Sequence, residues 1–244
     1  MDAYTLKARI FPAFLLFLPL AFAVAAWTPE AKLPVITLFG LSGNIAMSFF
    51  VAERVRDCGK NKEHALWAAW GGPPTTQLLR HRNSDIAAAM RNGWRRALET
   101  LVGAPMPSAA SEAKSPKKAD DAYEAAIARL RELTREVEKY PLVFKENVSY
   151  GFRRNLWALK PTGIFLSIGS SLACTAKIVY SSLREWDFES HSVISLMLSV
   201  VFLVCWLVVI RRSWVRLPAF EYAKRLLGAS FLLVDSKAQK STGS

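Results

Sequence analysis

The chain has 244 residues, of which 52% are apolar and 21% are charged. This composition is too apolar for a disordered protein and too charged for membrane helices alone, so it predicts membrane-embedded and soluble parts in one chain. A net charge of +12 would favour nucleic-acid binding in a soluble protein, but basic cytosolic loops explain much of it in a membrane protein. Cys58, Cys174 and Cys205 lie far apart, which predicts neither a disulfide framework nor a zinc site.

Four segments of the chain are long and apolar enough to cross a bilayer, which requires about 20 mostly apolar residues. They are residues 10–27, 33–52, 161–182 and 193–210. Short links join the first to the second and the third to the fourth, and such links connect antiparallel helices. We therefore predict an all-α integral membrane protein with four transmembrane helices arranged as two hairpins. Its predicted parts are a first hairpin (1–52), a helical cytosolic domain (53–160), a second hairpin (161–210) and a cytosolic amphipathic tail (211–244).

The charge distribution predicts the orientation of the four spans. Between the second and third spans there are 20 Lys and Arg residues and 13 Asp and Glu residues. After the fourth span there are seven Lys and Arg residues and two Asp and Glu residues. The hairpin tips are neutral or acidic, and they carry Glu30, Lys32, Arg184, Glu185, Asp187 and Glu189. Because basic loops stay in the cytosol, both termini and the large loop are expected there.

The first span has an alternative interpretation as a cleaved signal peptide. Lys7 and Arg9 precede its apolar run, which ends in Ala21-Phe22-Ala23-Val24-Ala25-Ala26. Cleavage would leave the topology of the other three spans unchanged.

The domain between the hairpins contains an unusual elbow, Trp70-Gly71-Gly72-Pro73-Pro74-Thr75-Thr76. A helix continuing from the second span is expected to end at the paired glycines and prolines, and Thr75 or Thr76 to cap the next helix. Beyond the elbow we predict a helix over 86–102 and a mobile linker over 103–118. An amphipathic helix should follow over 120–140 and end at Pro141, while Pro161 should begin the third span. The tail is expected either to lie along the inner leaflet or to pack under the cytosolic domain.

Polar residues on the second and third spans recur at steps of three and four, which places them on helical stripes. Small and hydroxylated side chains permit close helix packing, which is one interpretation. The other is a pore lining, because polar groups inside spans are functional candidates; Lys177 can alternatively snorkel to the outer surface. The candidate pore-lining residues are Asn44, Ser48, Ser167, Ser170, Cys174 and Lys177.

Basic and aromatic residues flank the elbow and form the second candidate site. Cations bind phosphates and indole rings stack on bases, so an anionic nucleotide or oligonucleotide is one predicted ligand. The alternative is attraction to anionic lipid headgroups, at about 1 kcal/mol per basic residue. The candidate ligand-binding residues are Trp70, Arg80, His81, Arg82, Arg91, Trp94, Arg95 and Arg96.

No enzyme motif is present in the sequence. Metalloprotease, serine-hydrolase, dinucleotide-binding and P-loop patterns are missing, and His64, His81 and His191 lack metal-ligand spacing. We therefore predict no enzymatic activity, no catalytic residue, no metal and no cofactor.

The layout of two membrane hairpins around a basic cytosolic domain with the Trp70 to Thr76 elbow resembles small bacterial anti-phage membrane effectors of the Hailong channel type. Operons of that family pair the effector with a nucleotidyltransferase. The resemblance implies a homo-oligomeric ion channel in the bacterial inner membrane. It further implies gating by a nucleotide or oligonucleotide second messenger, with opening that depolarises the infected cell. It carries over no site residue. The alternative function is a membrane anchor or scaffold that recruits a cytosolic partner through the 120–140 helix.

Overall fold

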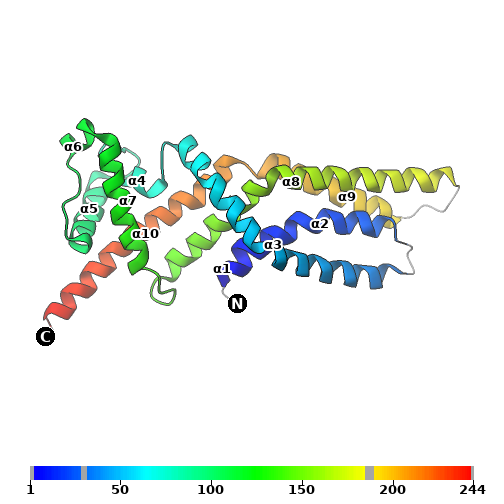
Figure 1. Ribbon diagram of the computed structural model, residues 1–244, viewed down its shortest axis with the longest axis horizontal. Helices are drawn as coiled ribbons and strands as arrows, with labels where there is room; N and C mark the ends of the chain where they lie inside the picture. Colours follow the sequence, from blue (N-terminus) through cyan, green and yellow to red (C-terminus); the bar gives the residue numbers. More distant parts are fainter. Residues whose placement is uncertain (1–2, 29–31, 185–189, 243–244) are drawn as a thin grey trace. The chain divides into compact units, whose positions relative to one another are not determined.

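The computed structural model describes residues 3–28, 32–184 and 190–242, and every regular element in these residues is helical (Figure 1). This agrees with the predicted all-α class. The chain forms two compact units, one from Met1–Glu63 with Gly151–Val215 and the other from His64–Tyr150 with Arg216–Ser244. The helices of the first hairpin region are α1 (Ala3–Thr5), the π-helix η1 (Leu6–Ile10), α2 (Phe11–Ala26) and α3 (Leu33–Trp70). They are followed by α4 (Pro74–Leu79), α5 (Ala88–Val102), α6 (Ala109–Lys114), α7 (Pro116–Leu133), α8 (Pro141–Leu183), α9 (Ser190–Val204), the π-helix η3 (Cys205–Val209) and α10 (Arg212–Thr242).

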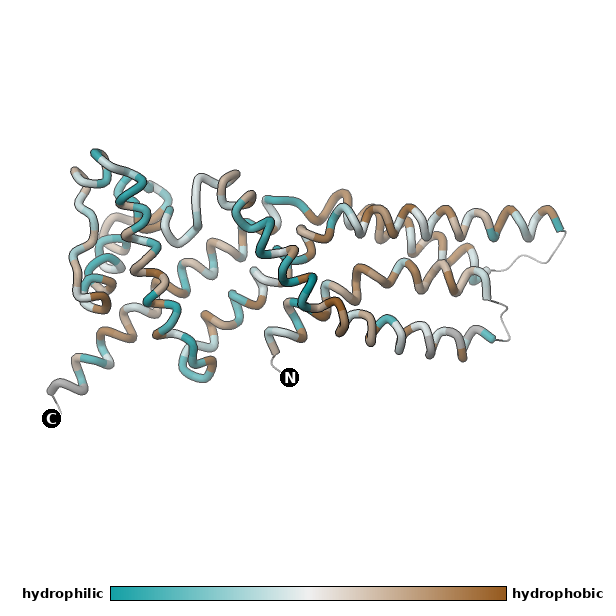
Figure 2. The backbone as a smooth tube through the Cα atoms, in the orientation of Figure 1, coloured by the Kyte–Doolittle hydropathy of each residue, from teal (hydrophilic) through white to brown (hydrophobic). Residues whose placement is uncertain are grey.

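Three helical segments among the described residues are long and apolar enough to cross a membrane. They are Ala3–Ala26, Pro141–Leu183 and Ser190–Val209. Figure 2 shows hydrophobic residues concentrated along α2 and α9, whereas α6 and α7 are largely hydrophilic. The second expected span, 33–52, falls in the first half of α3 and is not one of the three, so a fourth span stays a prediction. The hairpin-tip residues Glu30, Glu185, Asp187 and Glu189 lie outside the described residues.

Two prolines occupy helical positions that differ from those expected. Pro141 does not end a helix but begins α8, and Pro161 lies inside that continuous helix instead of starting a span. Proline fits the first helical position, where no intrahelical N–H bond is needed. Inside a helix it weakens one turn, and Lys62 Nζ donates a hydrogen bond to the Ala158 carbonyl in that turn at 2.9 Å.

The predicted elbow is present, but its threonines do not cap a helix. Gly71 (φ 91°) and Gly72 (φ 124°) adopt backbone conformations that other residues rarely take, and α3 ends immediately before them. Thr75 and Thr76 lie buried inside α4. Arg80 Nη1 donates to the Gly71 carbonyl at 2.7 Å, so a side chain from beyond α4 fixes the elbow.

The segment 103–118, expected as a mobile linker, instead contains α6 and the first turn of α7. The hydroxyl of Ser108 accepts a hydrogen bond from the Ser111 N–H at 3.2 Å and caps α6. Before it, the Met106 N–H donates to the Glu99 carboxylate at 2.9 Å. Capping and side-chain contacts therefore order a segment whose composition resembles a linker.

The amphipathic helix and the tail pack into the same core of the second unit. Tyr123, Ile127 and Leu130 of α7 and Leu226 and Leu227 of α10 are fully buried there. The partner surface expected for the amphipathic helix thus lies within the chain. The helix ends at Leu133 rather than at residue 140, and the Thr134 hydroxyl donates to the Leu130 carbonyl at its end.

Candidate functional site

A cluster of polar side chains in the second unit gathers around one buried carboxylate, that of Glu112 on α6. His81 and Arg82 come from the turn after α4, and Arg95 comes from α5, whose start is set by the extended backbone at Ala87. Tyr123 comes from the apolar face of α7. We call these residues, together with Arg91 one turn before Arg95, the Glu112 cluster.

The Glu112 carboxylate is held by hydrogen bonds and by two guanidinium groups. Its Oε2 accepts from the backbone N–H of His81 and from Tyr123 Oη, both at 2.9 Å. Arg95 Nη2 lies 3.5 Å from the same oxygen, and Arg82 Nη1 lies 3.8 Å from Oε1. Glu112 is only 3% exposed, so water contributes little to the solvation of its charge.

Arg95 is a buried cation, 5% exposed, whose donors are only partly used. Its Nη1 donates to the His81 ring, and its Nη2 donates to Tyr123 Oη. The distance from Arg95 Nη1 to His81 Nδ1 is 2.7 Å, while His81 Nε2 lies 3.0 Å from the Pro107 carbonyl oxygen. Among the described residues, Arg95 Nε is buried and has no acceptor.

Arg91 shows the same feature one turn earlier on α5. Its Nη1 donates to the Asn83 carbonyl, and its Nε is buried without an acceptor among the described residues. The cluster therefore contains three arginines and one carboxylate, which Arg82 and Arg95 approach directly. Among the described residues, the Nε atoms of Arg91 and Arg95 have no acceptor. The cluster therefore has a net positive charge and N–H donors that make no hydrogen bond to a described residue, and both features favour binding of an anion.

Burial and hydrogen bonding shift three pKa values in the cluster, and burial lowers that of Arg95. Burial alone raises the pKa of Glu112, but hydrogen bonds from the His81 backbone and from Tyr123 outweigh it, so the net pKa lies below the ordinary value of 4.5. Burial, reinforced by the bond to Glu112, raises the pKa of Tyr123 to about 12. At neutral pH, Glu112 is thus the anion of the cluster and Tyr123 a neutral donor.

The depressed Glu112 pKa predicts an acid-sensitive contribution to stability. A carboxyl whose folded pKa is lowered stabilises the fold above its unfolded pKa and loses that contribution as pH falls through the folded value. We expect the free energy of unfolding of the full chain to exceed that of Glu112→Gln at neutral pH, with the difference shrinking below about pH 4.5. Urea titrations in detergent micelles across pH measure it. Glu124→Gln, at an exposed α7 position, should show no such pH dependence.

The other candidate ligand residues occupy different surroundings. Arg80 is paired with Asp120 through two hydrogen bonds of 2.8 and 2.7 Å, so its role is to fix the elbow. Trp94 is 3% exposed in the core and presents no face for base stacking. Arg96 is exposed on α5, and Trp70 is partly buried at the end of α3. Four of the eight candidates, His81, Arg82, Arg91 and Arg95, belong to the Glu112 cluster.

Sequence reasoning missed Glu112 and Tyr123 as members of the site. Glu112 lies in a segment rich in Ala, Ser, Pro and Lys, and Tyr123 lies on the apolar stripe of its helix. The only signal in the sequence was a single acidic residue in that Ala- and Ser-rich segment.

The candidate pore-lining stripe on α8 faces the interior of the single chain. Ser170 Oγ donates to the Pro19 carbonyl at 2.6 Å and lies 2.8 Å from Ser199 Oγ of α9. Cys174 Sγ lies 4.0 Å from the Phe22 carbonyl. All four members are buried: Ser167, Ser170, Cys174 and Lys177. These contacts are the close helix packing that was the first interpretation of the stripe.

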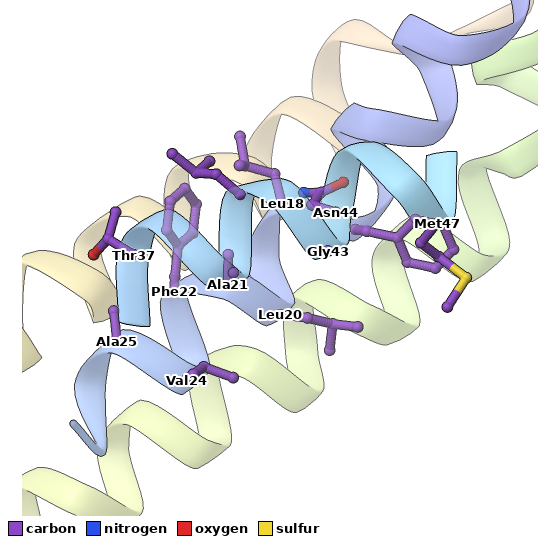
Figure 3. Close-up of a pocket in the computed structure, with 13 residues that line it drawn as sticks. Leu18, Leu20, Ala21, Phe22, Val24, Ala25, Thr37, Gly43, Asn44 and Met47 are labelled. Carbon is purple, nitrogen blue, oxygen red and sulfur yellow. The ribbon is translucent and has the colours of Figure 1, made fainter. Parts of the chain in front are cut away.

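The pair on α3 has different surroundings. Asn44 and Ser48 are also buried, and Ser48 Oγ donates to the Asn44 carbonyl at 2.6 Å. Asn44 Nδ2, however, has no acceptor among the described residues. It lies at a pocket of about 380 Å³ between α2 and α3, whose other walls include Leu20 and Phe22 (Figure 3). On the outward face of α3, Leu38 is 66% exposed.

No group of three or more His, Cys, Asp and Glu among the described residues is arranged to hold a metal ion. Comparisons with protein-family models, with curated proteins and with solved structures gave no match to this chain.

Proposed function

We propose that the chain is a subunit of an oligomeric inner-membrane channel, opened or closed by an anionic nucleotide or oligonucleotide that binds the Glu112 cluster in a cytosolic second unit. The observation that carries this proposal is the surplus of arginine donors in the cluster. The biological role that fits it is anti-phage defence by membrane depolarisation.

Phosphate is the anion that matches the surplus donors. A buried guanidinium N–H without an acceptor costs about 1–3 kcal/mol, and within the part of the chain that the structure describes the Nε atoms of Arg91 and Arg95 are both in this state. Phosphate oxygens accept several hydrogen bonds at once, and arginine engages them bidentately. The Arg82 side chain is 51% exposed, which gives a ligand access to the cluster from solvent.

The predicted number of spans and the surface of α3 favour assembly into an oligomer. Four spans are too few to enclose a wide pore, so several copies would have to surround it. Ser170 of α8 and Ser199 of α9 bond to each other, although Ser167 Oγ of α8 is buried without a partner among the described residues. On α3, Asn44 Nδ2 likewise has no acceptor among these residues, and Asn44 lines the pocket beside α2. Exposed apolar side chains that can contact lipid or a neighbouring copy are Val35, Leu38, Ile45, Phe49 and Phe50 of α3. We therefore place the conducting path at α3 of neighbouring subunits.

Helix α3 is one of the three described helices that run from one unit into the other, with α8 and α10, and it offers a route between ligand site and pore. The boundary between the two units falls within α3, which ends at the elbow directly before α4 and the His81 turn. A ligand changes the open population only by its difference in affinity for the closed and open states. The Glu112 cluster would therefore have to differ between these states.

Ion flux from liposomes containing the purified protein tests the proposal. We expect ATP or short oligoadenylates to change the flux, and Arg82→Gln with Arg91→Gln to weaken this response about 10- to 100-fold because charge-assisted hydrogen bonds to phosphate are lost. Arg129→Gln, at an exposed position on α7, should respond like the unmodified protein. A protein that never conducts, with or without these ligands, would rule out the channel.

A further inference from the structure

The short helix α6 is attached to the second unit mainly through one charged side chain. Glu112 is its only buried residue, and the other five residues, Ala109, Ala110, Ser111, Ala113 and Lys114, are exposed. A six-residue helix is unstable in isolation, and α6 buries no apolar side chain to hold it in place. Its position therefore depends on the polar contacts of Glu112 and on the preceding loop, where His81 Nε2 lies 3.0 Å from the Pro107 carbonyl oxygen. In that loop the partly buried Met106 also packs against the core, and its N–H donates to Glu99.

The partners of Glu112 are the groups that proteins use to bind phosphate. A backbone N–H, a tyrosine hydroxyl and two guanidinium groups surround its carboxylate, from His81, Tyr123, Arg82 and Arg95. We propose that Glu112 is an internal occupant of this anion site, and that the phosphate group of a ligand displaces it and releases the α6 segment, residues 104–115. This inference rests on the proposed function, because the site and the ligand class are the same.

Charge favours the exchange of a carboxylate for a phosphate at this site. A phosphate monoester carries about −1.5 to −2 charges at neutral pH and offers three acceptor oxygens, against one charge and two oxygens for Glu112. It can therefore satisfy the N–H groups of Arg91 and Arg95 that have no acceptor with Glu112 in place. The displaced Glu112 carboxylate becomes hydrated, so it is not left buried and unpaired.

The exchange turns ligand binding into a change of structure. With Glu112 bound, residues 104–115 lie over His81 and Tyr123; with phosphate bound, the same residues are free and expose the surface beneath them. The Glu112 carboxylate also sets a minimum affinity for any competing anion, because an anion that binds arginine more weakly, such as chloride, cannot displace it. Selectivity for phosphate over common anions follows from this competition.

Glu112→Gln tests the competition directly. Glutamine keeps the shape of the side chain and an oxygen for the His81 N–H but removes the competing charge. We expect the full-length variant in detergent micelles to bind inorganic pyrophosphate about tenfold more tightly than the unmodified protein in isothermal titration calorimetry. Glu124→Gln is the matched control, because it removes an exposed acidic charge from α7 and should leave the affinity unchanged.

Hydrogen exchange of the unmodified protein supplies a second measurement that does not depend on the variant folding. Pyrophosphate should accelerate amide exchange in residues 104–115 while slowing it around Arg91 and Arg95. If pyrophosphate binds but the 104–115 amides stay protected, or if Glu112→Gln binds no more tightly, the displacement is wrong and the phosphate site stands. If neither protein binds pyrophosphate, the displacement and the phosphate site both fail.

Discussion

Replacing Arg95 with methionine should lower the free energy of unfolding of the second unit by about 3–5 kcal/mol. Methionine retains the apolar stem but removes the guanidinium that lies 3.5 Å from the Glu112 carboxylate. The buried carboxylate then lacks its buried counter-charge, which is far more destabilising than the loss of an exposed ion pair. Urea unfolding of the full chain in detergent micelles, with hydrogen exchange across α5 to α7, measures the loss.

A second substitution separates the cost of the uncompensated charge from that of lost packing. Adding Glu112→Gln to Arg95→Met removes that charge, so the double variant should recover much of the lost stability. The neighbouring exposed residue gives the control: Arg96→Met should change stability by less than about 0.5 kcal/mol. Equal effects of Arg95→Met and Arg96→Met would show that the buried pair does not stabilise the unit.

The helical class and most helix positions follow from local sequence patterns. Apolar runs predicted three helices that have the length and hydropathy of membrane spans. The helix expected over 86–102 is α5, Ala88–Val102, and it ends at Gly103 with φ 75°. Such features depend on residues close together in sequence. The error at Pro141 arose because proline is compatible with the first turn of a helix as well as with its end. Pro161 was expected at a helix start but lies inside α8, where the helix continues despite the missing proline N–H.

The candidate site was only partly predictable, because its centre depends on contacts between distant segments. The four-residue spacing of Arg91 and Arg95 on α5 puts both on one face of the helix, which is readable from the sequence. Trp94 was predicted to bind the ligand, but it is a core residue with Leu98 and Leu101. The spacing of these three residues, which places them on one face of a helix, is already visible in the sequence. Glu112 meets Arg95 only through tertiary packing, and nothing in its local sequence indicates burial.

The candidate pore-lining stripe on α8, in the first unit, also depends on contacts between segments that are distant in sequence. Spacing alone cannot distinguish a pore wall from a helix interface, because both need small polar residues on one face. The distinction comes from the acceptors, such as the Pro19 carbonyl that receives the Ser170 hydroxyl. Residues 19 and 170 are remote in sequence, so this contact is visible only in the fold.

Gly163→Ala should be among the most destabilising small substitutions in the first unit. A Cβ at residue 163 would lie 2.3 to 2.6 Å from three atoms of the Trp206 ring, well inside contact distance. Trp206 is 2% exposed in a core with Leu16 and Leu159, so its ring has little room to move. We expect a loss of about 3 kcal/mol, the upper end for overpacking, measured by chemical unfolding in detergent micelles.

Gly169→Ala provides the matched control in the same helix. No atom lies within 4 Å of a Cβ built there, and alanine is the better helix former by about 0.5–1 kcal/mol, so this variant should be neutral or slightly more stable. Equal unfolding curves for the two alanine variants would contradict the close Gly163–Trp206 contact. If that contact is correct, adding Trp206→Leu to Gly163→Ala should cost less than the sum of the single substitutions, because the smaller side chain relieves the overlap.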